Sequence, residues 1–219
     1  MSEFRAELRS LAAGSLPHLD PGEACHLALE SLDIPTWPQL PRRSFLENMY
    51  VQYSERFPGI AMSDGRIFVD RDRDLDAELE KLYVAYLTED LDYATISPDY
   101  ASGLYCFLDM QLGQLPVVKG QVTGPVSWGL TVADQSRKPV LYDDVLAEAV
   151  GNHLRLKATW MERALGKLAA RTVVFLDEPY MSSYGSAFLA LNRDQVVGLL
   201  TEVFARIEGL KGVHCCGNT

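Results

Sequence analysis

The sequence lacks any apolar run of about 20 residues, the length that a helix needs to cross a bilayer. Residues 1–5 also lack the order of a positively charged segment followed by an apolar one that marks a secretory signal peptide. Both absences argue against a membrane-spanning or secreted protein. We therefore expect a cytoplasmic location.

Cysteine and positive charge are both scarce. The 219 residues contain only 4 cysteines, Cys25, Cys106, Cys215 and Cys216, whose spacing fits no disulfide framework, so we interpret them as reduced thiols. Lys and Arg total 20 against 30 Asp and Glu, a formal net charge of -10. A field of this sign repels phosphate backbones and anionic membrane surfaces, so neither nucleic acid nor a membrane is an expected partner.

The remaining composition, 47% hydrophobic and 23% charged, is that of an ordinary globular protein, and we expect one domain over residues 1–219. Ser63-Asp64-Gly65 supplies turn chemistry for a hairpin within residues 58–70, an excursion from the main scaffold. The prolines of residues 34–41 exclude a helix there. Hydrophobic periodicity predicts an opening strand-like segment that ends at residues 14–17, and strands near residues 116–122, 172–176 and 212–216. It also predicts helices over 21–32, where Asp20 can form the cap, and over 45–57, 74–92, 101–113, 143–170 and 193–208.

This alternation of strands and helices implies parallel strands joined by crossover helices. In such sheets the polar residues that carry chemistry gather at the carboxyl ends of the strands. Polar residues directly follow apolar runs at Gly14-Ser15, Gln39, Thr123-Gly124, Asp177-Glu178 and residues 214–218. A barrel with one shared mouth, formed by these strand ends, explains the pattern best.

Two residues of the last predicted strand are candidate metal ligands. Alternation with a period of two places His214 and Cys216 on one face, roughly 6.5–7 Å apart along the backbone, and Cys215 on the other. Imidazole and thiolate both bind zinc, and a catalytic zinc site usually takes three protein ligands. The alternative is that a small apolar thiol and a hydrogen-bonded histidine merely pack at a strand end.

Asp177 and Glu178 end the most apolar predicted strand. A carboxylate at such a place normally needs a cation, a metal or several donors to offset its desolvation. Parity with Val173 and Phe175 turns Asp177 towards the mouth, where it would hold a substrate ammonium group. The alternative role for Asp177 is to cap the following loop.

Small residues and hydroxyls end two other predicted strands, at Gly14-Ser15 and at Thr123-Gly124. Exposed backbone N–H groups at such ends can hold a carboxylate, although each pair taken singly is only a turn signal.

Three further residues, Trp37, Arg42 and Arg43, are candidates for lining the mouth around an anionic group. A buried tryptophan and two surface arginines account for the same residues nearly as well.

Together these motifs resemble the family of barrel enzymes that includes cobalamin-independent methionine synthase, uroporphyrinogen decarboxylase and corrinoid-linked methyltransferases. The resemblance runs from about residue 13 to the end of the chain, with landmarks at residues 14–18 (GSLPH), 37–41 (WPQLP), 119–126 (KGQVTGPV), 176–179 (LDEP) and 214–218 (HCCGN). It implies a (β/α)8 TIM barrel, present here only through about strand five.

The resemblance to the methionine synthase branch also implies roles for the residues. It implies zinc ligation by His214 and Cys216 and a pocket shaped by the turn at Thr123-Gly124. With the candidates named above, the expected substrate-binding residues are Gly14, Ser15, Trp37, Arg42, Thr123, Gly124, Asp177 and Glu178. The Ser15 backbone and Asp177 would hold the amino-acid end of homocysteine, the thiol substrate. Zinc would make the thiolate available near neutral pH for a methyl group from a methyl-folate or from a methylcorrinoid on a corrinoid protein.

The sequence departs from this family at its end. Family members carry two further zinc ligands, a glutamate and a cysteine, on later strands, whereas this sequence stops at Thr219. We therefore expect a fragment without activity of its own, whose exposed strand edges favour a homo-oligomer or another partner. The alternatives are a metal-independent decarboxylase-like enzyme that uses Arg42 and Arg43, and a non-catalytic binding or assembly module.

Overall fold

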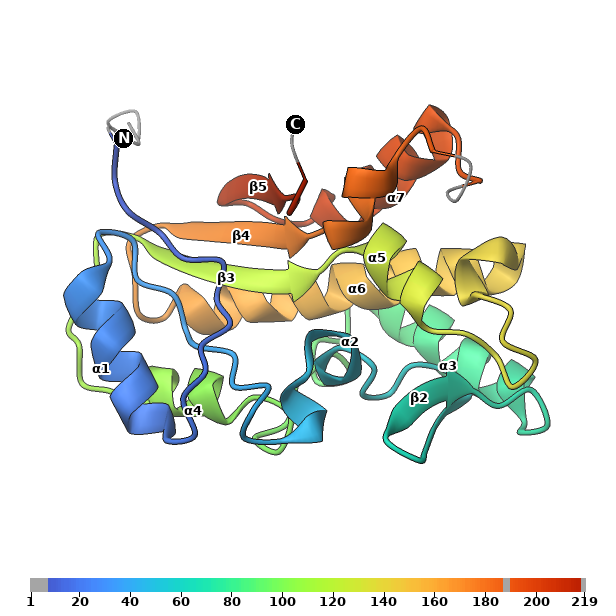
Figure 1. Ribbon diagram of the computed structural model, residues 1–219, viewed down its shortest axis with the longest axis horizontal. Coiled ribbons are helices and arrows are strands. Elements are labelled where there is room, and N and C mark those ends of the chain that lie inside the picture. Colours follow the sequence, from blue (N-terminus) through green and yellow to red (C-terminus); the bar gives the residue numbers. More distant parts are fainter. Residues whose placement is uncertain (1–7, 187–189, 218–219) are drawn as a thin grey trace.

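A three-stranded parallel sheet runs through the middle of the computed structural model, which describes residues 8–186 and 190–217 (Figure 1). Residues 1–5 and Asn218, which entered the sequence arguments, lie outside the described residues. The sheet has the order β3-β4-β5. Its strands are β3 (Val118–Thr123), β4 (Thr172–Asp177) and β5 (Leu210–His214).

Helices make both crossovers between these strands. The chain passes from β3 to β4 through α5 (Pro125–Thr131), the short 3-10 helix η2 (Val140–Tyr142) and α6 (Asp144–Leu165). It passes from β4 to β5 through the 3-10 helix η3 (Pro179–Ser183) and α7 (Arg193–Phe204). Asn192 and Gln195 form a capping box at the start of α7, which satisfies donors that the first helical turn leaves free.

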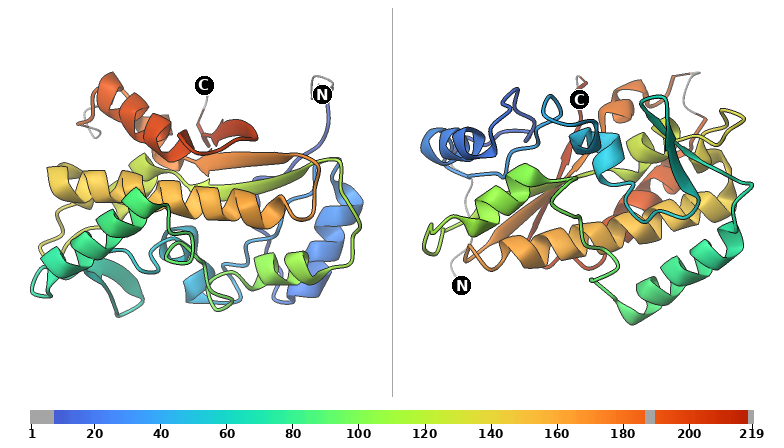
Figure 2. Two further views of the ribbon diagram at one scale, coloured as in Figure 1. Left: turned by 180° about the vertical axis from the view of Figure 1, so that it is seen from behind. Right: turned by 90° about the horizontal axis from the view of Figure 1, so that it is seen from below.

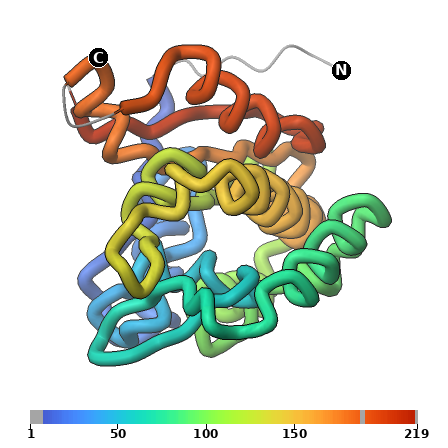
Figure 3. The backbone as a smooth tube through the Cα atoms, turned by 90° about the vertical axis from the view of Figure 1, so that its right-hand side faces the viewer, coloured from blue at the N-terminus to red at the C-terminus, as the bar shows by residue number. Residues whose placement is uncertain are grey.

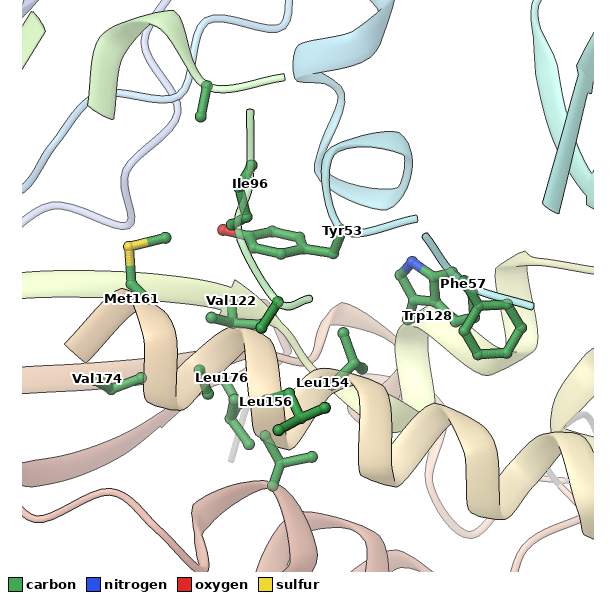
Figure 4. Close-up of a cluster of buried hydrophobic side chains, with 14 of the residues drawn as sticks. Tyr53, Phe57, Ile96, Val122, Trp128, Leu154, Leu156, Met161, Val174 and Leu176 are labelled. Carbon is green, nitrogen blue, oxygen red and sulfur yellow. The ribbon is translucent and has the colours of Figure 1, made fainter. Parts of the chain in front are cut away.

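Helix α6 covers one face of the sheet (Figure 2) and lies between α3 (Leu75–Thr88) and α7 (Figure 3). The Asp143 side chain caps α6 by accepting a hydrogen bond from the Leu146 N–H at 3.1 Å. The core between α6 and the sheet is shown in Figure 4 and includes Val122, Leu154, Leu156, Met161, Val174 and Leu176. Burial of each such side chain contributes roughly 1.5–3 kcal/mol. Among the described residues, no helix is both long enough and apolar enough to span a membrane.

The first third of the chain forms a separate layer beside β3. Helix α1 (Pro21–Ser31) begins where the sequence predicts, because the Asp20 side chain accepts a hydrogen bond from the Glu23 N–H at 2.8 Å. Helix α4 (Ser102–Asp109) packs against α1 (Figure 1). Gly103 at the start of α4 lies so close to the Pro38 carbonyl that a side chain there would overlap it.

Strands β1 (Ile60–Ser63) and β2 (Arg66–Val69) pair antiparallel as a hairpin. Asp64 and Gly65 between them both have positive φ, as a two-residue hairpin turn of type I′ requires.

The helix predicted over residues 45–57 is wrong in extent. The segment holds only the 3-10 helix η1 (Phe45–Glu47) and the short α2 (Met49–Gln52). Asn48 has an extended backbone, and its side chain accepts a hydrogen bond from the Tyr50 N–H, so it ends one turn and starts the next.

The prediction of a (β/α)8 barrel is also wrong. The described residues form an open three-stranded parallel sheet and a separate two-stranded hairpin, and neither closes on itself. The segments expected to supply earlier strands make only single bridges, Ser15 with Gln39 and Thr36 with Lys119. The prolines of residues 34–41 lack the N–H groups that a continuous ladder would need.

Candidate functional site

Three polar residues lie in a row at the carboxyl ends of the strands. Thr123 is paired with Asp177 in the register of β3 and β4, and Asp177 is paired with His214 in the register of β4 and β5. Residues in register on neighbouring strands of a parallel sheet point to the same face. The structure therefore places a hydroxyl, a carboxylate and an imidazole side by side, from three segments that lie far apart in the sequence.

Asp177 is buried, with 8% of its surface exposed, and its Oδ1 atom has no hydrogen-bond partner among the described residues. Burial raises the pKa of the Asp177 carboxyl to about 6, while Lys119 and His214 act in the opposite direction. A buried carboxylate oxygen without a donor is unfavourable unless a ligand supplies one. Asp177 is thus the residue of this row that is best prepared to accept a cationic group.

The Nε2 atom of His214 lies 3.2 Å from the Sγ atom of Cys216, which is the second residue after β5 and is exposed. Tetrahedral zinc, with ordinary Zn–N and Zn–S bonds, would hold two such atoms about 3.6 Å apart. The nitrogen and sulfur atoms could therefore occupy two of the four ligand positions of one zinc ion after a shift of a few tenths of an ångström. Within the described part of the chain, no group of three or more His, Cys, Asp or Glu side chains is placed to hold a metal ion.

Glu178 is fully buried, and both of its carboxylate oxygens are occupied by groups at the start of α5. Oε1 accepts a hydrogen bond from the Val126 N–H at 2.9 Å, and Oε2 accepts from the Ser127 N–H at 2.8 Å and the Ser127 hydroxyl at 2.6 Å. Burial raises the pKa of Glu178 to about 7 against the effect of these donors. Gly124 makes room for this carboxylate, since any Cβ there would overlap it. Glu178 thus holds α5 against the end of β4.

Gly14 and Ser15, predicted at the end of the first strand-like segment, lie beside β3 on the face of the sheet that carries Thr123. Gly14 is buried and has a φ of +134°, and it lies directly against the side chain of Gln121. Ser15 is exposed, and its hydroxyl donates a hydrogen bond to the Gln39 side chain at 3.3 Å. A residue larger than glycine at position 14 would displace Gln121.

Trp37, Arg42 and Arg43 differ in their surroundings. Trp37 is fully buried, and its Nε1 atom has no hydrogen-bond partner among the described residues. Arg42 is exposed at the surface, whereas Arg43 forms an ion pair of 3.1 Å with the buried Glu47. The structure thus supports a structural role for Arg43.

Sequence reasoning missed two buried polar residues of β3, Lys119 and Gln121, which share the face of Thr123. The Lys119 ammonium group donates to the Ala13 carbonyl at 2.6 Å and to the Gln121 side chain at 3.2 Å. Gln121 also accepts a hydrogen bond from the Thr36 hydroxyl at 2.8 Å. Burial lowers the pKa of Lys119 to about 8, whereas Asp177 acts to raise it. The polar residues at every second position of β3 were a signal that could have revealed this face.

Tyr50 is a second residue that the sequence did not single out. Burial raises the pKa of its phenol, a hydrogen bond with Thr131 lowers it, and Tyr180, Glu178 and Cys216 raise it further. These neighbours place the Tyr50 phenol at the same end of the sheet as the predicted site. The sequence did not reveal it, because its neighbours come from segments far along the chain, and its own segment only predicted a helix.

A cavity of about 630 Å³ lies at the opposite end of the sheet, where β4 and β5 begin. Three arginines and two glutamates line it together with small and apolar residues, namely Glu162, Arg163, Arg171, Arg206, Glu208, Ala169, Ala170 and Leu210. Its lining contains none of the site residues that the sequence predicted.

Comparisons of the chain with family models, with curated proteins and with solved structures find no match. The class of the protein therefore comes from its own fold and site. It is an α/β protein in which a three-stranded parallel sheet brings a buried carboxylate, an imidazole and a thiol together at its carboxyl end.

Proposed function

We propose that the carboxyl end of the sheet binds zinc through His214 and Cys216 and prepares a thiol substrate, such as homocysteine, to receive a methyl group. The observation that carries this proposal is the 3.2 Å separation of His214 Nε2 and Cys216 Sγ. A catalytic zinc site usually has three protein ligands. The proposal therefore requires at least one ligand from outside residues 8–186 and 190–217.

The zinc would lower the pKa of the substrate thiol, so that a thiolate is available near neutral pH. Asp177 would accept the substrate ammonium group at its unpartnered Oδ1 atom, beside His214 in the register. The backbone at Gly14-Ser15 would hold the substrate carboxylate. These contacts orient the sulfur, which attacks the methyl carbon as the bond from that carbon to the donor breaks.

The choice of homocysteine as substrate and the methyl donor both rest on sequence resemblance. A methylcorrinoid on a corrinoid protein and a methyl-folate are both donors of the enzymes that the sequence resembles. A reaction through reduced thiols also agrees with a cytoplasmic location, which belongs to the same proposal.

A second candidate, a binding or assembly module, is favoured by the edge of β5. Among the described residues no strand pairs with its outer edge, and Leu210 and Val213 are exposed there. An unpaired edge of this kind can add a strand from a partner or from a second copy. Sedimentation of the purified chain at several concentrations tests it: assembly that persists after loss of zinc binding favours the module over the enzyme.

The zinc proposal is tested by titrating the purified, reduced chain with zinc and, in parallel, with cobalt(II), whose thiolate absorption reports the bound cysteine. We expect His214→Ala and Cys216→Ser each to weaken binding about tenfold or more. Cys215→Ser is the matched control, because it removes the adjacent thiol, which alternation places on the other face.

Homocysteine should perturb the cobalt(II) spectrum of the unaltered chain. In Asp177→Asn the metal should still bind, but the homocysteine concentration needed for this change should rise. Absence of metal binding in the unaltered chain, or equal losses in Cys215→Ser and Cys216→Ser, would contradict the zinc proposal.

A further inference from the structure

Two cysteines that the proposed function does not use face each other between α1 and α4. Cys25 of α1 is fully buried, and its thiol donates a hydrogen bond to the Gly103 carbonyl of α4 at 3.5 Å. The side chain of Cys106, one turn further along α4, is also a hydrogen-bond partner of the Cys25 thiol. The two helices pack against each other in the layer beside β3 (Figure 1). Two thiols from different packed helices therefore lie close together.

The two thiols differ in their access to solvent. Cys25 is buried, whereas Cys106 is partly exposed. Burial raises the pKa of the Cys25 thiol, and the neighbouring Cys106 raises it further. The thiolate is the reactive form, so a dissolved reagent should react first with the more accessible Cys106. Cys25 should then react only with the modified Cys106 sulfur.

We propose that Cys25 and Cys106 are a modification site, at which a low-molecular-weight disulfide such as oxidised glutathione converts the two thiols into a reversible disulfide between α1 and α4. The Cys106 thiolate attacks one sulfur of oxidised glutathione, whose S–S bond breaks and releases one glutathione thiolate. The Cys25 sulfur then loses its proton and attacks the Cys106 sulfur, which expels the second glutathione. The two protein thiols are oxidised, and one oxidised glutathione is reduced to two glutathione thiols, which take up the two protons.

The crosslink would act on the layer that borders the candidate site. Gly103 of α4 lies against the Pro38 carbonyl, and the Pro35 carbonyl accepts a hydrogen bond from the Lys119 N–H of β3. Gln39 directly follows Pro38 and contacts Ser15. A bond between α1 and α4 therefore constrains the same layer that holds the first two strand ends. It also restricts the unfolded chain, so the oxidised protein should unfold at a higher urea concentration.

The test uses the full chain with Cys215 and Cys216 both replaced by serine, so that Cys25 and Cys106 are the remaining thiols. The folded protein is treated with oxidised glutathione, alkylated with iodoacetamide after unfolding, and analysed by mass spectrometry. We expect loss of both alkylation sites, a mass lower by two hydrogen atoms, one crosslinked peptide pair, and full reversal by dithiothreitol. Because one of the two proposed zinc ligands, Cys216, is absent from this protein, the result is independent of the proposed function.

Two variants in the same background provide the controls. Cys25→Ala should leave a stable glutathione adduct on Cys106, since the second thiol is missing. Cys106→Ser should resist oxidation while folded, because Cys25 is buried. A lasting glutathione adduct on Cys106 in the parent protein, or a crosslink that forms only in urea, would overturn the proposal.

Discussion

Asp177 and His214 are directly opposite each other in the parallel register of β4 and β5, so a buried carboxylate and an imidazole share one face of the sheet. Cys216 adds a thiol 3.2 Å from the imidazole. The carboxylate in this cluster is desolvated without a full set of hydrogen-bond donors, which lowers the free energy of unfolding of the protein. This effect can be measured.

Replacing Asp177 with asparagine should stabilise the protein near neutral pH. Burial raises the pKa of Asp177 from 3.8 to about 6, so the fold favours the protonated carboxyl. The protonated carboxyl therefore adds to the free energy of unfolding; this contribution is fully present below pH 3.8 and is lost as the pH rises through about 6. Asparagine stays neutral, and we expect a gain of about 1–3 kcal/mol at about pH 7.5 and almost none at about pH 4.

Urea unfolding of Asp177→Asn at the two pH values checks this expectation. The exposed Asp72 supplies the control, because Asp72→Asn should change stability by less than about 0.5 kcal/mol at either pH. A gain that is the same at both pH values would show that desolvation of the charge is not its cause.

Gly124→Ala should destabilise the fold by about 1–3 kcal/mol, because the added Cβ overlaps the Glu178 carboxylate. That carboxylate cannot move freely, since Val126 and Ser127 hold both of its oxygens. Gly198→Ala in α7 is the matched control: its Cβ would meet no atom within 4 Å. The control should be neutral or gain up to about 1 kcal/mol from helix propensity. Equal unfolding midpoints for the two variants would contradict the tight packing at Gly124.

The neighbouring arginines 42 and 43 should differ sharply in their effect on stability. Arg43→Ala removes the ion pair to the fully buried Glu47, leaving the Ser102 hydroxyl as a donor to that carboxylate, and we expect a loss of about 1–3 kcal/mol. Arg42→Ala removes an exposed side chain and should change stability by less than about 0.5 kcal/mol. Thermal unfolding of both variants measures this difference, and similar losses of stability in the two variants would show that the ion pair is not the cause.

The sequence by itself determined the elements whose causes are local. The cap at Asp20 starts α1, the turn at Asp64 and Gly65 forms the hairpin, and the alternation in β4 turns Asp177 to the face of His214. Each of these signals depends on residues within a turn or two of the chain, so composition and spacing are sufficient to detect it.

Only the tertiary structure decided how the segments combine. The polar residues at Gly14-Ser15 and Gln39 follow apolar runs, which predicted strand ends there. These segments nevertheless join by single bridges, because ladder formation depends on partners far along the chain. For the same reason the sequence could not predict three other pairings. These are the hydrogen bonds of Glu178 with α5, the ion pair of Arg43 with Glu47, and the proximity of Cys25 and Cys106. The local sequence determines which donor and acceptor groups are present, whereas the packing of distant segments determines which of these groups interact.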